Sequence, residues 1–103
     1  MIPAPVGLWI DRSRAVIVFA RSLTAHLVEA RLHSPSSYYD SVISALGTPG
    51  RVLIMGPGET KTELQERLEQ SSLWRGWVVQ LEPSSSTSNR EILAELAERL
   101  QPE

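Results

Sequence analysis

Short apolar runs alternate with polar residues in the first third of the chain. The runs VGLWI (Val6 to Ile10) and AVIVFA (Ala15 to Ala20) consist largely of apolar side chains, and only the four polar residues DRSR separate them. Two such runs with a short polar connection predict a β-hairpin whose second strand is buried. The next segment, LTAHLVEARL (Leu23 to Leu32), alternates less cleanly and includes a histidine and a glutamate. This pattern is typical of a strand at the edge of a sheet.

Beyond residue 33 the spacing of the apolar residues becomes that of a helix. A first helix is indicated by four residues at helical spacing and a glycine at the stopping position, namely Tyr39, Val42, Ile43, Leu46 and Gly47. RVLIM, which starts at Arg51, is apolar again and predicts a buried strand. Residues 59–71 then predict a helix with Leu64 and Leu68 on one face, and GWVVQLE (Gly76 to Glu82) predicts the last strand.

The C-terminal segment carries the signals for a closing helix. Ser88 lies three residues before Glu91, which is the spacing of a capping box. The inner stripe of this helix is formed by Ile92, Leu93, Leu96 and Leu100. The complete order is β-β-β-α-β-α-β-α, in which three antiparallel strands precede two crossovers. This order predicts an α/β fold with a mixed sheet and helices packed over it, and the ribonuclease-H-like arrangement is the best-known solution.

The composition narrows the class of protein. With 103 residues, 42% of them apolar, the chain suits one domain that spans residues 1–103. A net charge of −2 and a pI near 5.7 argue against a broad basic face, so we expect no DNA binding and at most a local patch that contacts RNA. No cysteine is present, which excludes disulfides and thiolate chemistry. The sequence shows no signal peptide and no apolar run near the roughly 20 residues that span a membrane. We therefore expect a small cytoplasmic protein without membrane contact.

The segment GPGETK, which begins at Gly56, has the layout of a phosphate-binding loop without its chemistry. A Walker loop places glycine directly before its lysine, so that backbone N–H groups surround the phosphates. Here Thr60 precedes Lys61, Pro57 has no N–H, and a glutamate lies where a phosphate would arrive. We interpret the segment as a strand-to-helix turn that Gly56 and Gly58 permit and Pro57 stiffens. We expect no bound cofactor.

A longer stretch of the chain resembles a known family. YYDSVISALGTPGRVLIMGPGETKTELQERL resembles the central, second domain of eukaryotic and archaeal class-1 peptide release factors and of Pelota, the ribosome-rescue factor. WVVQLEPSSSTSNREILAEL is similar to that family's next strand, loop and closing helix, and GLWIDRSRAVIV is similar to the first hairpin of small bacterial relatives. The resemblance spans nearly the whole chain and implies a ribonuclease-H-like fold. Gly56, Pro57, Gly58 and Lys61 match the family's turn, where their role is chiefly architectural.

The sequence departs from the release factors at their catalytic tip. Those proteins carry a Gly-Gly-Gln loop just before the helix that here begins near Ser36, whereas this chain has no Gly-Gly pair and only LHSPSS (Leu32 to Ser37) at that place. Peptide release by that chemistry is therefore not expected. Pelota also lacks the tip and works by binding. The resemblance thus implies a non-enzymatic protein that associates with the ribosome or with ribosomal RNA.

Basic residues beside the predicted turns are the candidate contacts with RNA. We expect Arg12, Arg14 and Lys61 to bind RNA phosphates, within a basic rim that also includes Arg51 and Arg75. The alternative interpretation is that these residues are isolated, solvated charges.

Two other functions stay open at this point. Asp11, Glu59 and Glu82 lie at or near the ends of predicted strands, where nucleases of ribonuclease-H-like fold hold two metal ions. A divergent metal-dependent nuclease is therefore one alternative. His26 and His33 have no acid or cysteine at ligand spacing, so we expect no other metal site. The second alternative is a protein–protein adaptor that pairs through the edge strand LTAHLVEA, for example as a homodimer.

Overall fold

The computed structural model describes residues 6–19, 24–32, 34–46, 51–70, 77–86 and 88–100 of the chain. Within these ranges the helices and strands follow the order predicted from the sequence, and a short 3₁₀-helix is added after the third strand. The elements are β1 (Val6–Ile10), β2 (Arg14–Phe19), β3 (Thr24–Glu29), η1 (Ala30–Leu32), α1 (Pro35–Leu46), β4 (Arg51–Gly56), α2 (Thr60–Gln70), β5 (Trp77–Pro83) and α3 (Asn89–Leu100).

The described strands form one five-stranded sheet in the order β3-β2-β1-β4-β5. β2 pairs antiparallel with both β1 and β3. β4 pairs in parallel with both β1 and β5. The sheet is therefore mixed, and its order and strand directions are those of the ribonuclease-H-like arrangement, which confirms the predicted fold class. β3 lies at an edge of this sheet, as its sequence pattern predicted.

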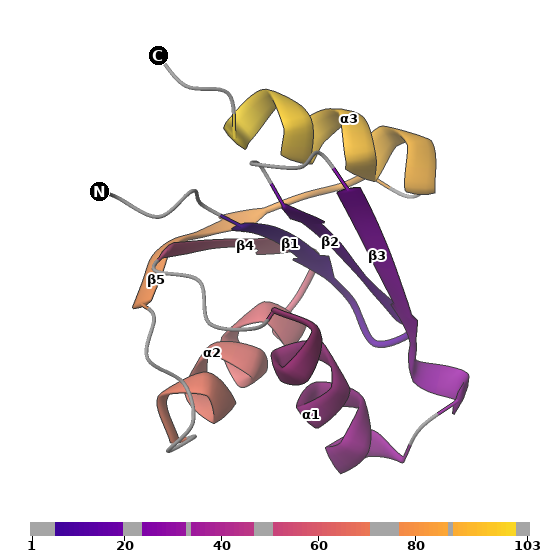
Figure 1. Cartoon of the computed structure of the whole chain (residues 1–103), viewed down its shortest axis with the longest axis vertical. Coiled ribbons are helices and arrows are strands. Elements are labelled where there is room, and N and C mark those ends of the chain that lie inside the picture. Colours follow the sequence, from indigo (N-terminus) through magenta and orange to yellow (C-terminus); the bar gives the residue numbers. More distant parts are fainter. Residues whose placement is uncertain are drawn as a thin grey trace.

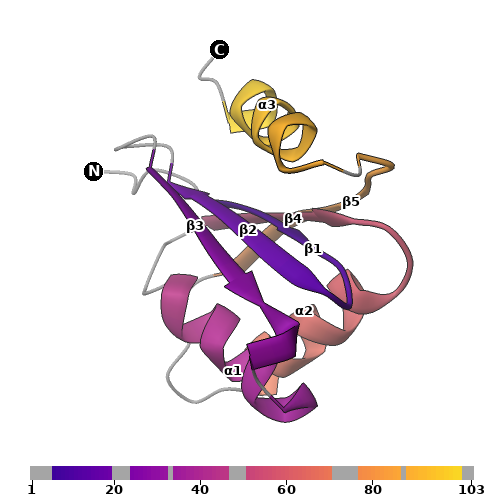
Figure 2. The same cartoon turned by 90° about the vertical axis from the view of Figure 1, so that its right-hand side faces the viewer.

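Helices cover both faces of the sheet, as Figures 1 and 2 show. α1 and α2 lie next to each other under one face, and α3 crosses the opposite face over β1 and β2. The chain thus forms three layers, with the sheet in the middle. None of the helices in the described ranges is long and apolar enough to cross a membrane.

The two faces of the sheet build two separate apolar clusters. Leu8, Ile10 and Ile17 belong to the cluster under α1 and α2. Trp9 and Val16 alternate with them and pack on the other face, where α3 contributes Ile92 and Leu96. Because β1 lies between two strands and between two helical layers, all five of its residues are buried. This is why its sequence is a continuous apolar run and does not alternate with polar residues.

The ends of the elements show where local sequence decides the structure. The predicted capping box of α3 is present: Ser88 N donates to Glu91 Oε1 at 3.2 Å, and Glu91 N donates to Ser88 Oγ at 3.2 Å. β3 is shorter than the predicted strand because it stops at Glu29 and the chain turns into η1. At this point Ala30 N donates to Ser13 O at 2.9 Å, which ties the beginning of η1 to the connection between β1 and β2.

Candidate functional site

Three parallel strands end at the same edge of the sheet, which we call the carboxyl edge. β1 leads there into the turn 11–13, β4 leads into the turn 57–59, and β5 leads into the loop that precedes α3. Ligands of open α/β sheets bind in the crevice outside the carboxyl ends of the strands. The carboxyl edge is therefore the first place to look for a site.

The turn after β4 depends on its two glycines. Gly56 has a φ of +148°, and a Cβ at this position would lie 2.1 Å from the carbonyl oxygen of Ile10. Gly58 has a φ of +66°, in the left-handed region that glycine adopts without steric cost. Lys61 Nζ donates to Gly58 O at 2.6 Å. The backbone of β4 thus passes too close to the end of β1 for any side chain, and the lysine lies against the turn.

Asp11 organises the turn between β1 and β2. Its Oδ1 accepts hydrogen bonds from Ser13 N at 2.8 Å, from Ser13 Oγ at 2.9 Å and from Arg14 N at 2.8 Å. Tyr38 Oη, from α1, donates to the backbone oxygen of Asp11 at 2.9 Å. Burial, together with the nearby Asp11 charge, raises the pKa of Tyr38. The phenol therefore stays protonated as the donor that ties this turn to α1.

Arg12 and Arg14 share the turn but lie in different layers. The guanidinium carbon of Arg14 lies 5.4 Å from the ring centroid of Trp9, which packs in the cluster under α3. Arg12 is exposed, and its positive charge acts on the other side of the sheet, where it lowers the pKa of Tyr39 in α1. The net shift of that pKa is still upward, to about 12, because burial and a 2.7 Å hydrogen bond to Glu63 Oε2 outweigh Arg12. The two arginines thus lie near the carboxyl edge without forming one patch.

A buried hydrogen-bond network connects β1, the loop after β5 and α3. Trp9 Nε1 donates to Ser84 Oγ at 3.0 Å, and Trp9 is only 1% exposed. Ser84 Oγ donates in turn to Glu95 Oε1 at 2.5 Å and accepts from Ser86 N at 3.3 Å. Ser86 Oγ donates to the same glutamate oxygen at 3.2 Å. The network fixes the loop over the indole and gives the buried N–H its partner.

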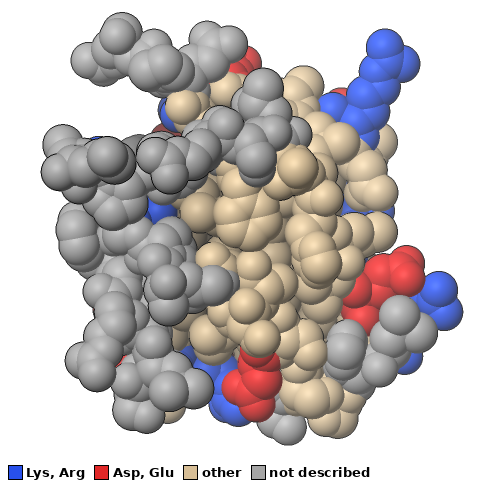
Figure 3. All heavy atoms as spheres, in the orientation of Figure 1, with Lys and Arg blue, Asp and Glu red and all other residues tan. Residues whose placement is uncertain are grey.

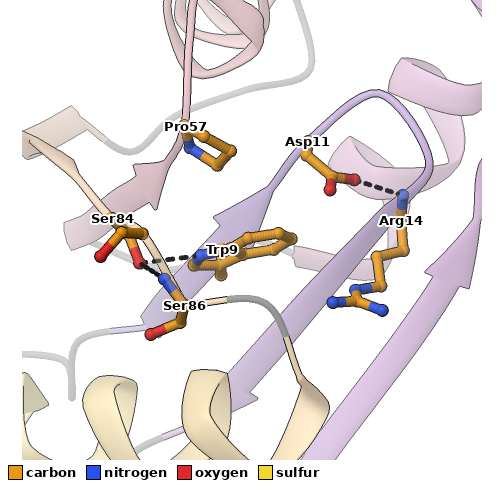
Figure 4. Close-up of a pocket in the computed structure, with 7 residues that line it drawn as sticks. Trp9, Asp11, Arg14, Pro57, Ser84 and Ser86 are labelled. Carbon is orange, nitrogen blue, oxygen red and sulfur yellow. Dashed lines mark hydrogen bonds between the residues drawn. The ribbon is translucent and has the colours of Figure 1, made fainter.

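A cavity of about 170 Å³ opens between these features. Figure 4 shows Trp9 lying between the Ser84 and Ser86 side chains on one side and the Asp11 and Arg14 side chains on the other. Its lining comes from the end of β1, the start of β2, the turns after β1 and β4, and the loop after β5: Trp9, Asp11, Arg14, Pro57, Ser84, Ser85 and Ser86. Arg14 and Pro57, two residues that the sequence singled out for different reasons, thus meet at one cavity.

The predicted basic rim is not a single surface. Arg12, Arg14 and Lys61 lie near the carboxyl edge. Arg51 begins β4, and a strand of six residues extends about 17 Å from there to its carboxyl end, so Arg51 lies at the opposite edge of the sheet. Arg75, like His33, lies outside the described residues. The three remaining basic residues are therefore the candidate contacts, and they approach the edge from different layers.

The carboxylates proposed for a nuclease do not gather. Within the described ranges, which include Asp11, Glu59 and Glu82, no group of three or more histidine, aspartate or glutamate side chains could hold a metal ion. Asp11 is engaged in its turn, and Glu82 Oε1 forms an ion pair with Arg99 Nη1 at 3.1 Å. Nothing in this arrangement favours the nuclease alternative.

The edge strand leaves an exposed surface. Residues 24–27 of β3 are exposed, and Leu27 is 46% exposed. Figure 3 shows the face of the molecule on which β3 and α1 lie toward the viewer in Figure 1. The described side chains in the middle of this face are not those of Lys, Arg, Asp or Glu, and these four residue types gather at its margins. Pairing with another strand at this edge stays an alternative.

Sequence reasoning missed Ser84 and Glu95, which complete the site. As a sequence, the run SSSTS (Ser84 to Ser88) indicates only a loop. A buried tryptophan requires a partner for its N–H, and this was the one available signal. It could not identify a serine 75 positions away in the sequence.

The order of the elements and of the strands in the sheet defines the class of fold: the chain is a ribonuclease-H-like α/β domain. The particular likeness is to Pelota. The crystal structure of Pelota from Archaeoglobus fulgidus matches with a TM-score of 0.70 and 19% sequence identity, over 97% of this chain and 32% of that one. Pelota from Thermoplasma acidophilum matches with a TM-score of 0.64 and 18% identity, over 96% of this chain and 35% of that one.

This likeness establishes the fold and no more. The chain spans about a third of the length of the two Pelota proteins. No protein-family model matches the sequence, and no curated protein matches it. The structural comparison therefore shows a Pelota-like domain fold. The sequence by itself had shown only motifs that resemble those of the family.

Proposed function

We propose that this protein is a non-enzymatic binding domain of the translation machinery, which associates with the ribosome through the carboxyl edge of its sheet. The observation that carries the proposal is the Pelota-like fold over 97% of the chain. Residues 1–103 then correspond to one domain of the kind found at the centre of Pelota and the class-1 release factors. Such a role requires a cytoplasmic location.

The carboxyl edge offers suitable groups for contact with ribosomal RNA. Arg12 is exposed in the first turn, Arg14 lines the cavity, and Lys61 lies in the first turn of α2. Arginine and lysine bind phosphates from such positions without a globally basic surface. This matters here because the whole chain has a net charge of −2.

The acidic side chains support binding in preference to catalysis. Asp11 accepts three hydrogen bonds within its own turn, Glu82 is paired with Arg99, and Glu95 accepts from two serines. Each of these carboxylates has a structural task. A general acid or base, by contrast, must face the reacting group of a substrate.

Co-sedimentation with ribosomes through sucrose tests the proposal. The wild-type protein is expected to move into the ribosomal fractions at low salt and to leave them as salt rises. Changing Arg12 and Arg14 together to glutamate should abolish this shift. The control changes Arg51, which begins β4, and Arg67, in the last turn of α2, to glutamate, which alters the net charge equally but away from the carboxyl edge. If the wild-type protein stays at the top of the gradient at every salt concentration, the proposal is wrong.

A further inference from the structure

β3 is the outermost strand on its side of the sheet and is paired along one side only. Its neighbour in the sheet is β2, and in Figures 1 and 2 no described helix or strand runs along its outer side. Every second residue of such a strand directs its backbone N–H and C=O groups away from the sheet. Within the described part of the chain, β3 therefore presents a row of donors and acceptors that a further strand can use.

Two hydrogen bonds next to the paired strands identify the outward residues of β3. Ala30 N donates to Ser13 O at 2.9 Å, which continues the register of β2 and β3 by one position. Counting back from Ala30, every second residue of β3 directs its backbone groups to β2. Arg14 O accepts from Asp11 N at 3.0 Å, so Arg14 turns to β1 and the next residue of β2 turns to β3, which gives the same result. The outward residues of β3 are Ala25, Leu27 and Glu29.

The outer side of β3 lacks the features that protect most edge strands. Natural proteins blunt such strands with charged side chains, proline, β-bulges or a covering element. The segment Thr24–Val28 contains no proline and no Lys, Arg, Asp or Glu, and its register with β2 is regular. Residues 24–27 are exposed, and Leu27 is 46% exposed. This side of the sheet is therefore open to a further strand.

A second copy of the same strand matches the outward row completely. If two β3 strands pair antiparallel around a two-fold axis at Leu27, the two Leu27 residues lie opposite each other and Ala25 lies opposite the partner's Glu29. All outward residues then exchange backbone hydrogen bonds, about six in total. An axis at either neighbouring residue would leave one end of the row unpaired and form only about four. The strand is thus self-complementary in one register.

The side chains suit this antiparallel arrangement. Leu27 lies opposite Val16 of β2, so its side chain is on the face of the sheet that carries α3. Across the axis, two Leu27 side chains would cover each other and bury apolar surface that is exposed in the single chain.

The charges favour the same arrangement. Glu29 is the only residue of β3 that is Lys, Arg, Asp or Glu. In the antiparallel pair the two Glu29 residues would lie about 14 Å apart, beyond the screening length of about 8 Å. A parallel pair in register would instead place them side by side.

We propose that this protein forms a homodimer in which two β3 strands pair antiparallel around a two-fold axis at Leu27, so that the two sheets become one continuous sheet. The carboxyl edges of the two copies then face in opposite directions and both stay accessible. One strand pair is a small interface, so we expect a dissociation constant of about 10–100 μM. The inference goes beyond the proposed function and does not rest on it.

Sedimentation equilibrium of the full chain tests the dimer. The apparent mass should rise from 11.4 kDa toward twice that value as the concentration increases from about 2 μM to about 1 mM. Leu27→Lys places two like charges at the axis and should weaken association about tenfold or more. Gln70→Lys adds the same charge at an exposed position at the end of α2, away from β3, and should associate like the wild type.

Single cysteines test the register, because the chain has no cysteine of its own. In the Leu27→Cys variant the two Cα atoms would lie about 5.5 Å apart across the axis, a distance that a disulfide spans. Mild oxidation should therefore give a covalent dimer. Ala25→Cys lies on the same strand and face, but about 14 Å from its copy, and should remain largely uncrosslinked.

The possible results decide the inference without reference to ribosome binding. A mass of 11.4 kDa at every concentration would overturn it and leave a strand of another protein as the occupant of this edge. Undiminished association of Leu27→Lys, or equal crosslinking of both cysteine variants, would also overturn it. If circular dichroism shows that Leu27→Lys does not fold, the two cysteine variants decide alone. Co-sedimentation with ribosomes can fail while the dimer forms, and the dimer can fail while ribosomes bind.

Discussion

Replacing Gly56 with alanine should destabilise the protein far more than the same change at Gly58. A Cβ at Gly56 would lie 2.1 Å from Ile10 O, a fixed backbone atom, and 3.1 Å from Ile10 C. A non-bonded carbon–oxygen pair needs more than 3 Å, so β4 or β1 must move by about 1 Å, and overpacking of this kind costs about 1–3 kcal/mol. The φ of +148° adds a backbone strain of about 1–3 kcal/mol for a residue with a side chain. We therefore expect Gly56→Ala to lower the free energy of unfolding by about 3–5 kcal/mol.

Gly58→Ala is the matched control within the same turn. Gly58 has a φ of +66°, but a Cβ there would meet no atom within 4 Å. Only the left-handed strain remains, which costs about 1 kcal/mol. Urea unfolding followed by tryptophan fluorescence measures both variants. A domain of this size has an m value of about 2 kcal/mol/M, so the midpoints should fall by about 0.5 M for Gly58→Ala and by about 2 M for Gly56→Ala. Equal losses in the two variants would refute the close approach of β4 to β1.

Three further predictions follow from the core and the hydrogen-bond network. Ser84→Ala leaves the buried Trp9 N–H without its partner and should lower the free energy of unfolding by about 1–3 kcal/mol. Ser85→Ala, at an exposed position, should change it by less than about 0.5 kcal/mol. Equal losses of stability for the two variants in urea unfolding would contradict the hydrogen-bond network. Leu96→Ala removes a fully buried side chain of α3 and should lower the free energy of unfolding by about 2–5 kcal/mol. Leu93→Ala, in the same helix but at a position that is 36% exposed, should lower it only slightly. The pKa of Tyr39 is raised from 10.0 to about 12, which means that folding favours the protonated phenol. The stability that the Tyr39 phenol contributes is therefore fully present below pH 10 and is lost as pH rises from there through about 12. The difference in stability between the wild type and Tyr39→Phe should therefore be constant below pH 10 and shrink above it, and absorbance at 295 nm should show no ionisation of Tyr39 near pH 10 in the folded protein.

The sheet and its helices were predictable because their signals are local. The continuous apolar run of β1 reflects burial on both faces, and the spacing of Ser88 and Glu91 gave the start of α3. The order of three hairpin-connected strands and two crossovers then left few topologies to consider. The end of β3 was missed because the hydrogen bond between Ala30 and Ser13 links η1 to the turn between β1 and β2, which no pattern along a single strand records.

The site was predictable only in part, because its chemistry depends on contacts between distant segments. The sequence singled out Arg12 and Arg14 as neighbours in one turn. Arg12 lies in the turn and only Arg14 belongs to β2, so the alternation of a strand does not place the two side chains on the same side. Here Arg14 packs on Trp9 while Arg12 acts on Tyr39. Likewise the cavity joins a turn after β1 with a loop more than 70 residues later, and only the fold brings the two together.

The most direct test of the proposed function is the dependence of ribosome binding on salt concentration. If Arg12, Arg14 and Lys61 each contact a phosphate, the logarithm of the binding constant should fall against the logarithm of salt with a slope of about −2 to −3. Changing Arg12 and Arg14 together to glutamine should reduce that slope by about 1.5, while the matching change of Arg51 and Arg67, which lie away from this edge, should leave it unaltered. A slope near zero in the wild type, or the same slope in both double variants, would contradict the proposal that this edge of the sheet binds the ribosome.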